Sequence, residues 1–263
     1  MPNEEIEMSK GIITDIQRAS IHDGDGIRTT VFFKGCPLHC AWCHNPECIS
    51  FKPQILFYPD KCIGCGMCEQ GCYAGAKVVC GREMSSEMLL QEILQDVPYY
   101  GTSGGVTFSG GEPLAQKEFL STMLDKCKEQ GINCAVETSL ICFEEEIFQK
   151  LDFCMVDLKI WDAEIHWKYT GVSNKKIKEN LKKLDELGIP IIVRTPVIPG
   201  IRQDIPEISA FVRALFHVKK YELLPYHPLG VAKAEAMGIE QERFEIPEKE
   251  FMKGLERYAF IRG

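Results

Sequence analysis

The sequence lacks an excess of basic residues, a long apolar run and an apolar leader. Lys and Arg total 30 against 38 Asp and Glu, so the net charge is −8 at pH 7, which disfavours a general nucleic-acid or anionic-membrane surface. No apolar run approaches the roughly 20 residues that span a bilayer. The opening residues, MPNEEIEMSKGIIT, are acidic and lack the apolar core of a signal peptide. We therefore expect a cytoplasmic protein that binds neither nucleic acid nor membrane.

Cysteine, by contrast, is abundant. The chain has 13 Cys among 263 residues of otherwise ordinary composition, 45% hydrophobic and 26% charged, which suits one large domain with a small insertion. In a reducing compartment, closely spaced cysteines bind metal more often than they form disulfides. Nine of them lie between residues 36 and 80. We interpret the other four as packing residues because their neighbours are apolar or helical: Cys127, Cys134, Cys142 and Cys154.

Short apolar runs alternate with amphipathic segments along the chain. The alternation predicts strands at residues 29–35, 105–113, 132–138, 153–159, 189–200 and 220–227. It predicts a first helix that begins near residues 85–86 and further helices at residues 117–131, 144–151, 174–188, 207–218 and 247–258. Six strand–helix units are too few for an eight-fold barrel. We predict an α/β fold, a partial (β/α)6 barrel built from residues 1–43 and 85–263.

Residues 44–84 break the alternation, because they are rich in Cys, Gly and Pro and contain no long amphipathic helix. We predict that they form a small ferredoxin-like insertion.

Polar or glycine residues follow five of the predicted strands. In barrel-type folds the chemistry gathers at the carboxyl ends of the strands, so these residues are expected to share one site: Gly110, Gly111, Glu112, Glu137, Thr138, Asp157, Lys159, Arg194 and His227.

A cysteine triplet follows the first predicted strand. Cys36, Cys40 and Cys43 have the spacing C-x3-C-x2-C and supply three thiolates from one loop. A [4Fe–4S] cluster takes four ligands, so three leave one iron open to a small molecule. The alternative is a structural zinc with Cys48 or His44 as a distant fourth ligand, although paired x2 spacings are more usual for zinc.

The segment DGDGIRTTVFFKGCPLHCAWCHNPE closely resembles the opening of the glycyl radical enzyme activating enzymes. These belong to the radical S-adenosylmethionine superfamily and include the pyruvate formate-lyase activating enzyme. The resemblance continues through VTFSGGEPL, VDLK, HWKYTGVSN, RTPVIPG and ELLPYHPLG, and it covers most of residues 11–240. Each fragment alone is weak, but their order and spacing are highly specific.

The resemblance implies an activity. The triplet would hold a [4Fe–4S] cluster whose open iron binds S-adenosylmethionine, and one electron would cleave the cofactor. The resulting 5′-deoxyadenosyl radical would then take a Cα hydrogen from a glycine of a partner glycyl radical enzyme. Protein groups in such enzymes orient and shield the cofactor.

The resemblance also assigns residues to the cofactor. Gly110, Gly111 and Glu112 match the segment for its methionyl amino group, and Trp42 lies beside the last cysteine of the triplet. Lys159 and Arg194 can meet the carboxylate of the cofactor. Asp157 suits the ribose or a cation, and His227 matches the family position near the adenosine.

Some members of the family hold a monovalent cation beside the cofactor. The matching positions are Glu137, Thr138, Met155 and Asp157. The best-known member has Asp where this chain has Glu137. The longer carboxylate could coordinate a cation or fill the site itself, and both alternatives stay open.

The loop HDGDGIR, residues 22–28, matches a family signature near the incoming glycine. Asp25 replaces the more usual proline. Asp23 and Arg28 are our candidates for shaping the substrate end of the pocket. The alternative is a simple turn capped by Asp.

A second group of cysteines lies in the insertion. Cys62, Cys65, Cys68 and Cys72 follow the bacterial ferredoxin run C-x2-C-x2-C-x3-C, with Tyr73 where proline is usual. Residues 44–84 hold six Cys, too few for two all-cysteine cubanes. We predict one auxiliary [4Fe–4S] cluster on Cys62, Cys65 and Cys68, with Cys80 ranked first as fourth ligand, then Cys48, then Cys72. A structural zinc is the alternative.

The partners follow from the same resemblance. We expect a monomer that acts on a glycyl radical enzyme and receives electrons from a flavodoxin or ferredoxin type donor. The auxiliary cluster would relay electrons or help to dock the partner. Hydroxyproline dehydratase is our hypothesis for the partner. The alternatives are a radical S-adenosylmethionine enzyme acting on a small molecule and a non-catalytic electron-transfer or zinc protein.

Overall fold

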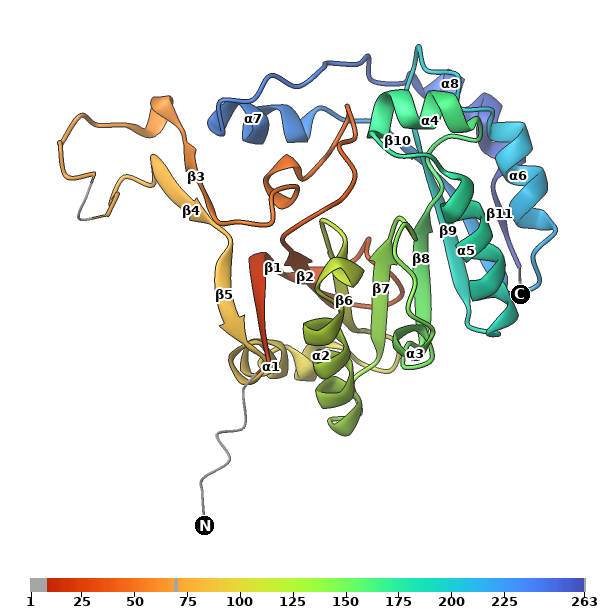
Figure 1. Cartoon of the computed structure of the whole chain (residues 1–263), viewed down its shortest axis with the longest axis horizontal. Helices are drawn as coiled ribbons and strands as arrows, with labels where there is room; N and C mark the ends of the chain where they lie inside the picture. Colours follow the sequence, from red (N-terminus) through yellow and green to blue (C-terminus); the bar gives the residue numbers. More distant parts are fainter. Residues whose placement is uncertain (1–8, 69–70, 263) are drawn as a thin grey trace.

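A computed structural model describes residues 9–68 and 71–262. A nine-stranded sheet runs through it in the order β11-β10-β9-β8-β7-β6-β2-β1-β5 (Figure 1). Its strands are β1 Lys10–Ser20, β2 Arg28–Phe33, β5 Arg82–Ser85, β6 Gly105–Gly110, β7 Cys134–Thr138, β8 Phe153–Asp157, β9 Ile191–Val197, β10 Val218–Pro225 and β11 Phe260–Ile261.

Six neighbouring strands, β2 and β6 to β10, are parallel to one another. They correspond to the six predicted strands, so the expected partial (β/α)6 arrangement is confirmed. The other three strands extend this sheet through antiparallel pairs: β1 lies beside β2, β5 lies beside β1, and β11 lies beside β10.

The helices lie between successive parallel strands and after β10, and Figure 1 shows α2, α3, α5 and α6 alongside the sheet. They are α1 Ser86–Leu94, α2 Lys117–Glu129, α3 Glu145–Phe148, α4 Ala163–Thr170, α5 Lys175–Glu186, α6 Ile205–Arg213, α7 Leu229–Ala236 and α8 Lys249–Leu255. The start predicted near residue 85 is confirmed, since Ser85 is the N-cap of α1 and its hydroxyl accepts a hydrogen bond from the Met88 amide. Helices α4 and α7 were not predicted.

The two faces of the parallel strands differ in polarity, because successive side chains on a strand point to opposite sides. One face contributes Val31, Phe108, Val136, Val156 and Val193 to the buried core. The alternate positions carry polar side chains, which we describe with the site. The core also takes in Cys127, Cys134 and Cys154, with Cys142 packed against it, so their interpretation as packing residues is confirmed.

Strands β3 Gln54–Phe57 and β4 Lys77–Cys80 form a separate two-stranded hairpin, which projects from the sheet in Figure 1. The hairpin lies within residues 44–84, the predicted insertion, and its long loop carries Cys62, Cys65, Cys68 and Cys72. Strand β5, at the end of that range, pairs with β1 in the main sheet.

Among the described residues, none of the helices has the length and apolarity to cross a membrane. The prediction that no signal peptide is present rests partly on residues 1–8, which lie outside the described residues.

Candidate active site

The loop after β2 carries the cysteine triplet, and backbone hydrogen bonds hold it at both sides. The Gly35 amide donates to the Cys48 carbonyl at 2.7 Å, which closes the loop on itself. The His39 and Ala41 amides donate to the carbonyls of Thr170 and Tyr169 at 2.8 and 2.9 Å, so the C-terminal end of α4 supports the loop. The triplet is therefore presented by a backbone that is closed on itself and tied to α4.

Trp42 is the apolar anchor of this loop. Its ring is 6% exposed and packs in a small cluster with Ile160, Ile198 and Tyr226, and it lies 6.1 Å from the ring of Tyr169. The side chain predicted to accompany the cofactor thus packs into a local core.

The three thiols of the triplet share one partly buried environment. Burial raises the pKa of Cys43 to about 12, and it raises the pKa values of Cys36 and Cys40 as well. Because thiolates are the ligands of iron–sulfur clusters, the loop must lose its protons when it takes up a cluster. The three thiols lie close enough to raise one another's pKa values, and such a group in a half-buried loop fits a cluster.

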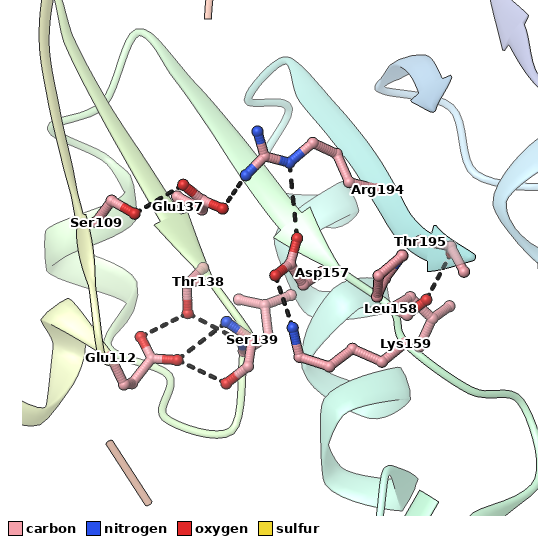
Figure 2. A network of polar contacts seen from close by, with 12 residues as sticks. Ser109, Glu112, Glu137, Thr138, Ser139, Asp157, Leu158, Lys159, Arg194 and Thr195 are labelled. Carbon is pink, nitrogen blue, oxygen red and sulfur yellow. Dashed lines mark hydrogen bonds and ion pairs between the residues drawn. The ribbon is translucent and has the colours of Figure 1, made fainter. Parts of the chain in front are cut away.

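Charged side chains line the carboxyl ends of three neighbouring strands, as Figure 2 shows. Lys159 Nζ lies 2.7 Å from Asp157 Oδ2, and Arg194 Nε lies 3.6 Å from Asp157 Oδ1. Arg194 also pairs with Glu137, and Glu137 accepts a hydrogen bond from Ser109 Oγ at 2.7 Å. These side chains form one network from β6 to β9.

The network adjoins the cysteine loop. Although burial opposes its charge, the pKa of Lys159 is raised, because the carboxylate of Asp157 and the thiols of Cys40 and Cys36 lie close to it. Burial lowers the pKa of Arg194, while Asp23 and Glu222 act in the opposite direction. The predicted site residues at four strand ends and in the cysteine loop are therefore brought together.

Gly110 and Gly111 lie where β6 meets the cysteine loop. Gly110 has φ +107°, and a Cβ there would collide with the backbone nitrogen of Phe33. A Cβ on Gly111 would collide with the carbonyl oxygens of Gly35 and Cys48. Glycine is required here because two backbones pack together.

Glu112 is fully buried, and its carboxylate is turned toward the chain. It accepts hydrogen bonds from Thr138 Oγ1 at 2.7 Å and from the Ser139 hydroxyl and amide at 2.6 and 3.0 Å. Burial raises the pKa of Glu112, although these donors oppose the effect. Glu112 therefore holds the end of β7 against the end of β6 (Figure 2).

The four candidate ligands of a monovalent cation are already engaged. Glu137 and Asp157 pair with Arg194, whose Nη1 also lies 3.6 Å from the sulfur of Met155. The Thr138 hydroxyl donates to Glu112. The guanidinium thus contacts three of the four groups, and the residues do not fit an additional cation.

Asp23 and Arg28 lie on the polar face of the sheet. The Asp23 carboxylate accepts hydrogen bonds from Ser20 and Thr30 hydroxyls, each at 2.6 Å. Arg28 is fully buried; it donates to Thr107 Oγ1 and to the Val106 carbonyl, both at 2.7 Å. Burial lowers the pKa of Arg28 to about 10, so it stays charged at neutral pH. Both side chains shape the loop of residues 22–28 from within.

His227 follows β10 and is exposed. Its ring lies 4.4 Å from that of His44, edge to face, which places it beside the cysteine loop.

The sequence analysis did not predict that the segment after His227 contacts the cysteine loop. The first turn of α7 brings Gly230 so close to the Cys43 carbonyl that a Cβ would collide with it, and Gln241 Nε2 donates to the same oxygen at 2.8 Å. The glycine that ends ELLPYHPLG was the available signal.

The insertion separates the predicted ligands of the auxiliary cluster. Cys62, Cys65 and Cys68 are exposed in the loop, whereas Cys80 is 6% exposed. Cys80 pairs with Gln54 at the base of the hairpin, and Lys77 pairs with Phe57 at the loop end. The structure therefore does not place Cys80 among the other three. In the described residues, no group of three or more His, Cys, Asp or Glu is arranged to hold a single metal ion.

The fold and the site together define a class. The structure combines a sheet with six parallel strands, a three-thiol loop after the first of them and paired charges at the next strand ends. These features are typical of an enzyme that uses a cluster and a small charged cofactor. The model of the radical SAM superfamily matches residues 30–212, where SAM denotes S-adenosylmethionine.

Similar proteins narrow the class. The chain is 36% identical over 276 aligned residues to the 4-hydroxyphenylacetate decarboxylase activating enzyme of Clostridioides difficile strain 630, covering 89% of this chain and 87% of that protein. It is 34% identical to the trans-4-hydroxy-L-proline dehydratase activating enzyme of Clostridioides difficile, covering 94% and 95%.

A solved domain of the pyruvate-formate lyase-activating enzyme from Bacteroides vulgatus ATCC 8482 superposes with a TM-score of 0.50 at 31% identity, over 59% of this chain and 92% of that one. The chain belongs to the radical S-adenosylmethionine superfamily and, within it, to the glycyl radical enzyme activating enzymes.

Proposed function

We propose that this chain activates a partner glycyl radical enzyme, with the triplet of Cys36, Cys40 and Cys43 as the cluster ligands. When bound, the cluster supplies the electron that cleaves S-adenosylmethionine, and the product radical takes a hydrogen from a glycine Cα of the partner. The observation that carries the proposal is the convergence of the three thiols with Lys159 and its neighbours at one edge of the sheet. Membership of the activating enzymes supports the same conclusion.

The chain's own residues would hold the cofactor by complementary charge. Among the described residues Lys159 has one carboxylate partner, so two of its three N–H donors stay available for the cofactor carboxylate. In the same part of the chain, the acceptor at Arg194 Nη1 is the weak sulfur of Met155, and this nitrogen can donate to the same carboxylate. Gly110 and Gly111 are partly exposed and carry no side chain, which leaves room for the amino end beside the cysteine loop, and Trp42 and Glu112 keep the two loops in place.

The test uses the full chain, reconstituted with iron and sulfide without oxygen and reduced chemically. The parent should release 5′-deoxyadenosine from S-adenosylmethionine and should produce a glycyl radical signal in a partner protein by electron paramagnetic resonance. Cys40→Ala should abolish both. Cys142→Ser is the matched control, since Cys142 is half-buried beside the core, and it should keep both.

The same experiment separates the alternatives. Cofactor cleavage without a glycyl radical in any candidate partner would favour an enzyme that acts on a small molecule. A reconstituted parent that cannot cleave the cofactor would favour a non-catalytic protein and would refute the proposal.

The partner's identity remains a proposal of its own. Relatives at nearly the same identity are named for a decarboxylase and for a dehydratase, so similarity does not single one out. We retain hydroxyproline dehydratase as the first partner to co-incubate. A flavodoxin or ferredoxin type donor, a monomeric state and a cytoplasmic location also stay predictions.

We further propose one auxiliary [4Fe–4S] cluster in the loop of the β3–β4 hairpin, held by Cys62, Cys65 and Cys68. Cys80 was our first choice for the fourth ligand. It lies three residues along β4 from Lys77, about 10 Å at 3.3 Å per residue, and is buried at the hairpin base. Cys72 belongs to the loop itself and its carbonyl accepts from the Gly75 amide at 3.0 Å. The geometry of the hairpin therefore favours Cys72 over Cys80 as the fourth ligand of the auxiliary cluster.

Iron analysis tests this proposal. The reconstituted parent should hold about eight irons, four for each cubane. Cys72→Ala should bring the content toward about four, while Cys80→Ala should leave it near eight. About twelve irons in the parent would refute a single auxiliary cluster, and a loss confined to Cys80→Ala would restore Cys80 as the ligand.

A further inference from the structure

Arg194 of β9 occupies the centre of a cage whose walls come from two neighbouring strands. Glu137 lies on β7, Met155 and Asp157 on β8, and all three contact its guanidinium. The arginine side chain is 6% exposed, so water screens these contacts little. Ser109 Oγ donates to the second oxygen of Glu137 at 2.7 Å, which orients that carboxylate toward the arginine.

The charges of the network already balance. Glu137 and Asp157 contribute two negative charges, and Lys159 and Arg194 contribute two positive charges. A hard cation prefers oxygen ligands that carry uncompensated negative charge. Here both carboxylates face an arginine whose charge is permanent.

We propose that the Arg194 guanidinium is a built-in substitute for a monovalent cation, and that Glu137 is the residue that positions it. The inference rests on the proposed function, because it concerns how the same site holds the carboxylate of S-adenosylmethionine. Glu137 is long enough to reach the guanidinium across the strand ends. Cofactor binding by this chain should then be independent of K⁺ and Na⁺.

The experiment measures the dissociation constant of S-adenosylmethionine for the reconstituted full chain by equilibrium dialysis without oxygen. Tetramethylammonium replaces K⁺ and Na⁺ at constant ionic strength, so general screening does not change. For the parent chain, adding K⁺ or Na⁺ should alter the constant less than about two-fold, which is under 0.5 kcal/mol. A larger dependence in the parent would overturn the inference.

Variants of the cage residues test directly whether the guanidinium takes the place of a cation. Arg194→Ala should weaken cofactor binding about ten-fold or more, the loss of one charge-assisted hydrogen bond. It also frees Glu137 and Asp157, so K⁺ or Na⁺ should restore part of the affinity. Weakened binding that neither ion restores would show that ion and guanidinium are not interchangeable and would overturn the inference.

Glu137→Gln and Glu137→Asp separate charge from shape. The amide keeps the size of Glu137 and can still accept from Ser109, but it loses the charge that holds Arg194, so binding should weaken; the aspartate should retain more affinity than the amide. The matched control is Glu144→Gln, an exposed ion pair with Lys117 at 2.7 Å, which should change nothing. Equal behaviour of Glu137→Gln and the control would refute a positioning role. Iron content and thermal unfolding verify that each variant folds.

These outcomes can be distinguished from a failure of the proposed function. A parent that binds the cofactor without K⁺ or Na⁺ but yields no glycyl radical would refute only the function. A parent that activates its partner only when K⁺ is present would refute only the built-in cation.

Discussion

Gly230 offers the sharpest test of how the cysteine loop is supported. It lies in the first turn of α7, where a Cβ would meet the carbonyl oxygen and carbon of Cys43 and the Cα of His44. All three atoms belong to the backbone of the cysteine loop, so no flexible side chain can move aside. Either α7 or the loop must shift. Overpacking of this kind costs about 1–3 kcal/mol, and the displaced backbone is the one that presents Cys43.

Gly230→Ala should therefore have two effects. At about 2–4 °C per kcal/mol for a chain of this size, the unfolding temperature should fall by about 2–12 °C. The iron content after reconstitution should also fall, because one thiol of the triplet moves with its backbone. Differential scanning fluorimetry and iron analysis measure the two effects.

Gly254→Ala is the matched control. Gly254 lies in α8, and no atom of the described residues comes within 4 Å of an added Cβ. Alanine there should stabilise the chain by about 0.5–1 kcal/mol, since glycine is the poorer helix residue, and iron content should not change. If Gly230→Ala behaved like Gly254→Ala in both assays, the close packing of α7 on the cysteine loop would be refuted.

Three further predictions follow from the buried groups. In Arg28→Lys, the ammonium cannot reproduce the two hydrogen bonds that the guanidinium donates to Thr107 and Val106. The variant should lower the free energy of unfolding by about 1.5–3 kcal/mol, measured by urea unfolding. It should also reduce partner activation more than cofactor cleavage. In the iron-free chain, Cys43 should alkylate far more slowly than exposed Cys62, because burial raises the pKa of Cys43 from 9.0 to about 12 and leaves it about a thousandth of the thiolate that it would otherwise have; equal labelling of the two residues by mass spectrometry would contradict this. Cluster uptake should release about three protons from the triplet and weaken as pH falls, because raised thiol pKa values keep the free loop protonated; uptake without proton release would disprove it.

The parallel strands were predictable because their signal is local. Each is a short apolar run between glycine, proline or polar residues. The two helices that were missed lack such a signal. In α4 the fully buried side chains are His166 and Thr170, which are polar, and His166 Nδ1 is bonded to the Val172 carbonyl at 2.7 Å. Helix α7 buries mainly small residues such as Gly230 and Ala234, so no stripe of large apolar residues marks it.

The members of the site were predictable, but their contacts were not. Polar residues at the carboxyl ends of the predicted strands indicate a shared site, and this inference places Lys159, Asp157 and Arg194 together. It does not say that Arg194 turns toward Glu137, because this depends on side-chain length across three strands. Nor does spacing reveal which end of the hairpin holds Cys80, since that requires the register of β3 against β4.

The base of the hairpin explains how the insertion is coupled to the catalytic loop. Lys34, the residue directly after β2, is 1% exposed, and its Nζ donates to the Glu47 carbonyl and to Gln54 Oε1 on β3. Lys233 of α7 reaches the carboxylate of Glu47 at 2.7 Å from the other side. A buried ammonium is stable only when its donors are satisfied, so the hairpin cannot rotate about its base without breaking these bonds. The base of the insertion is thus anchored on one side to the residue that follows β2 and on the other side to α7.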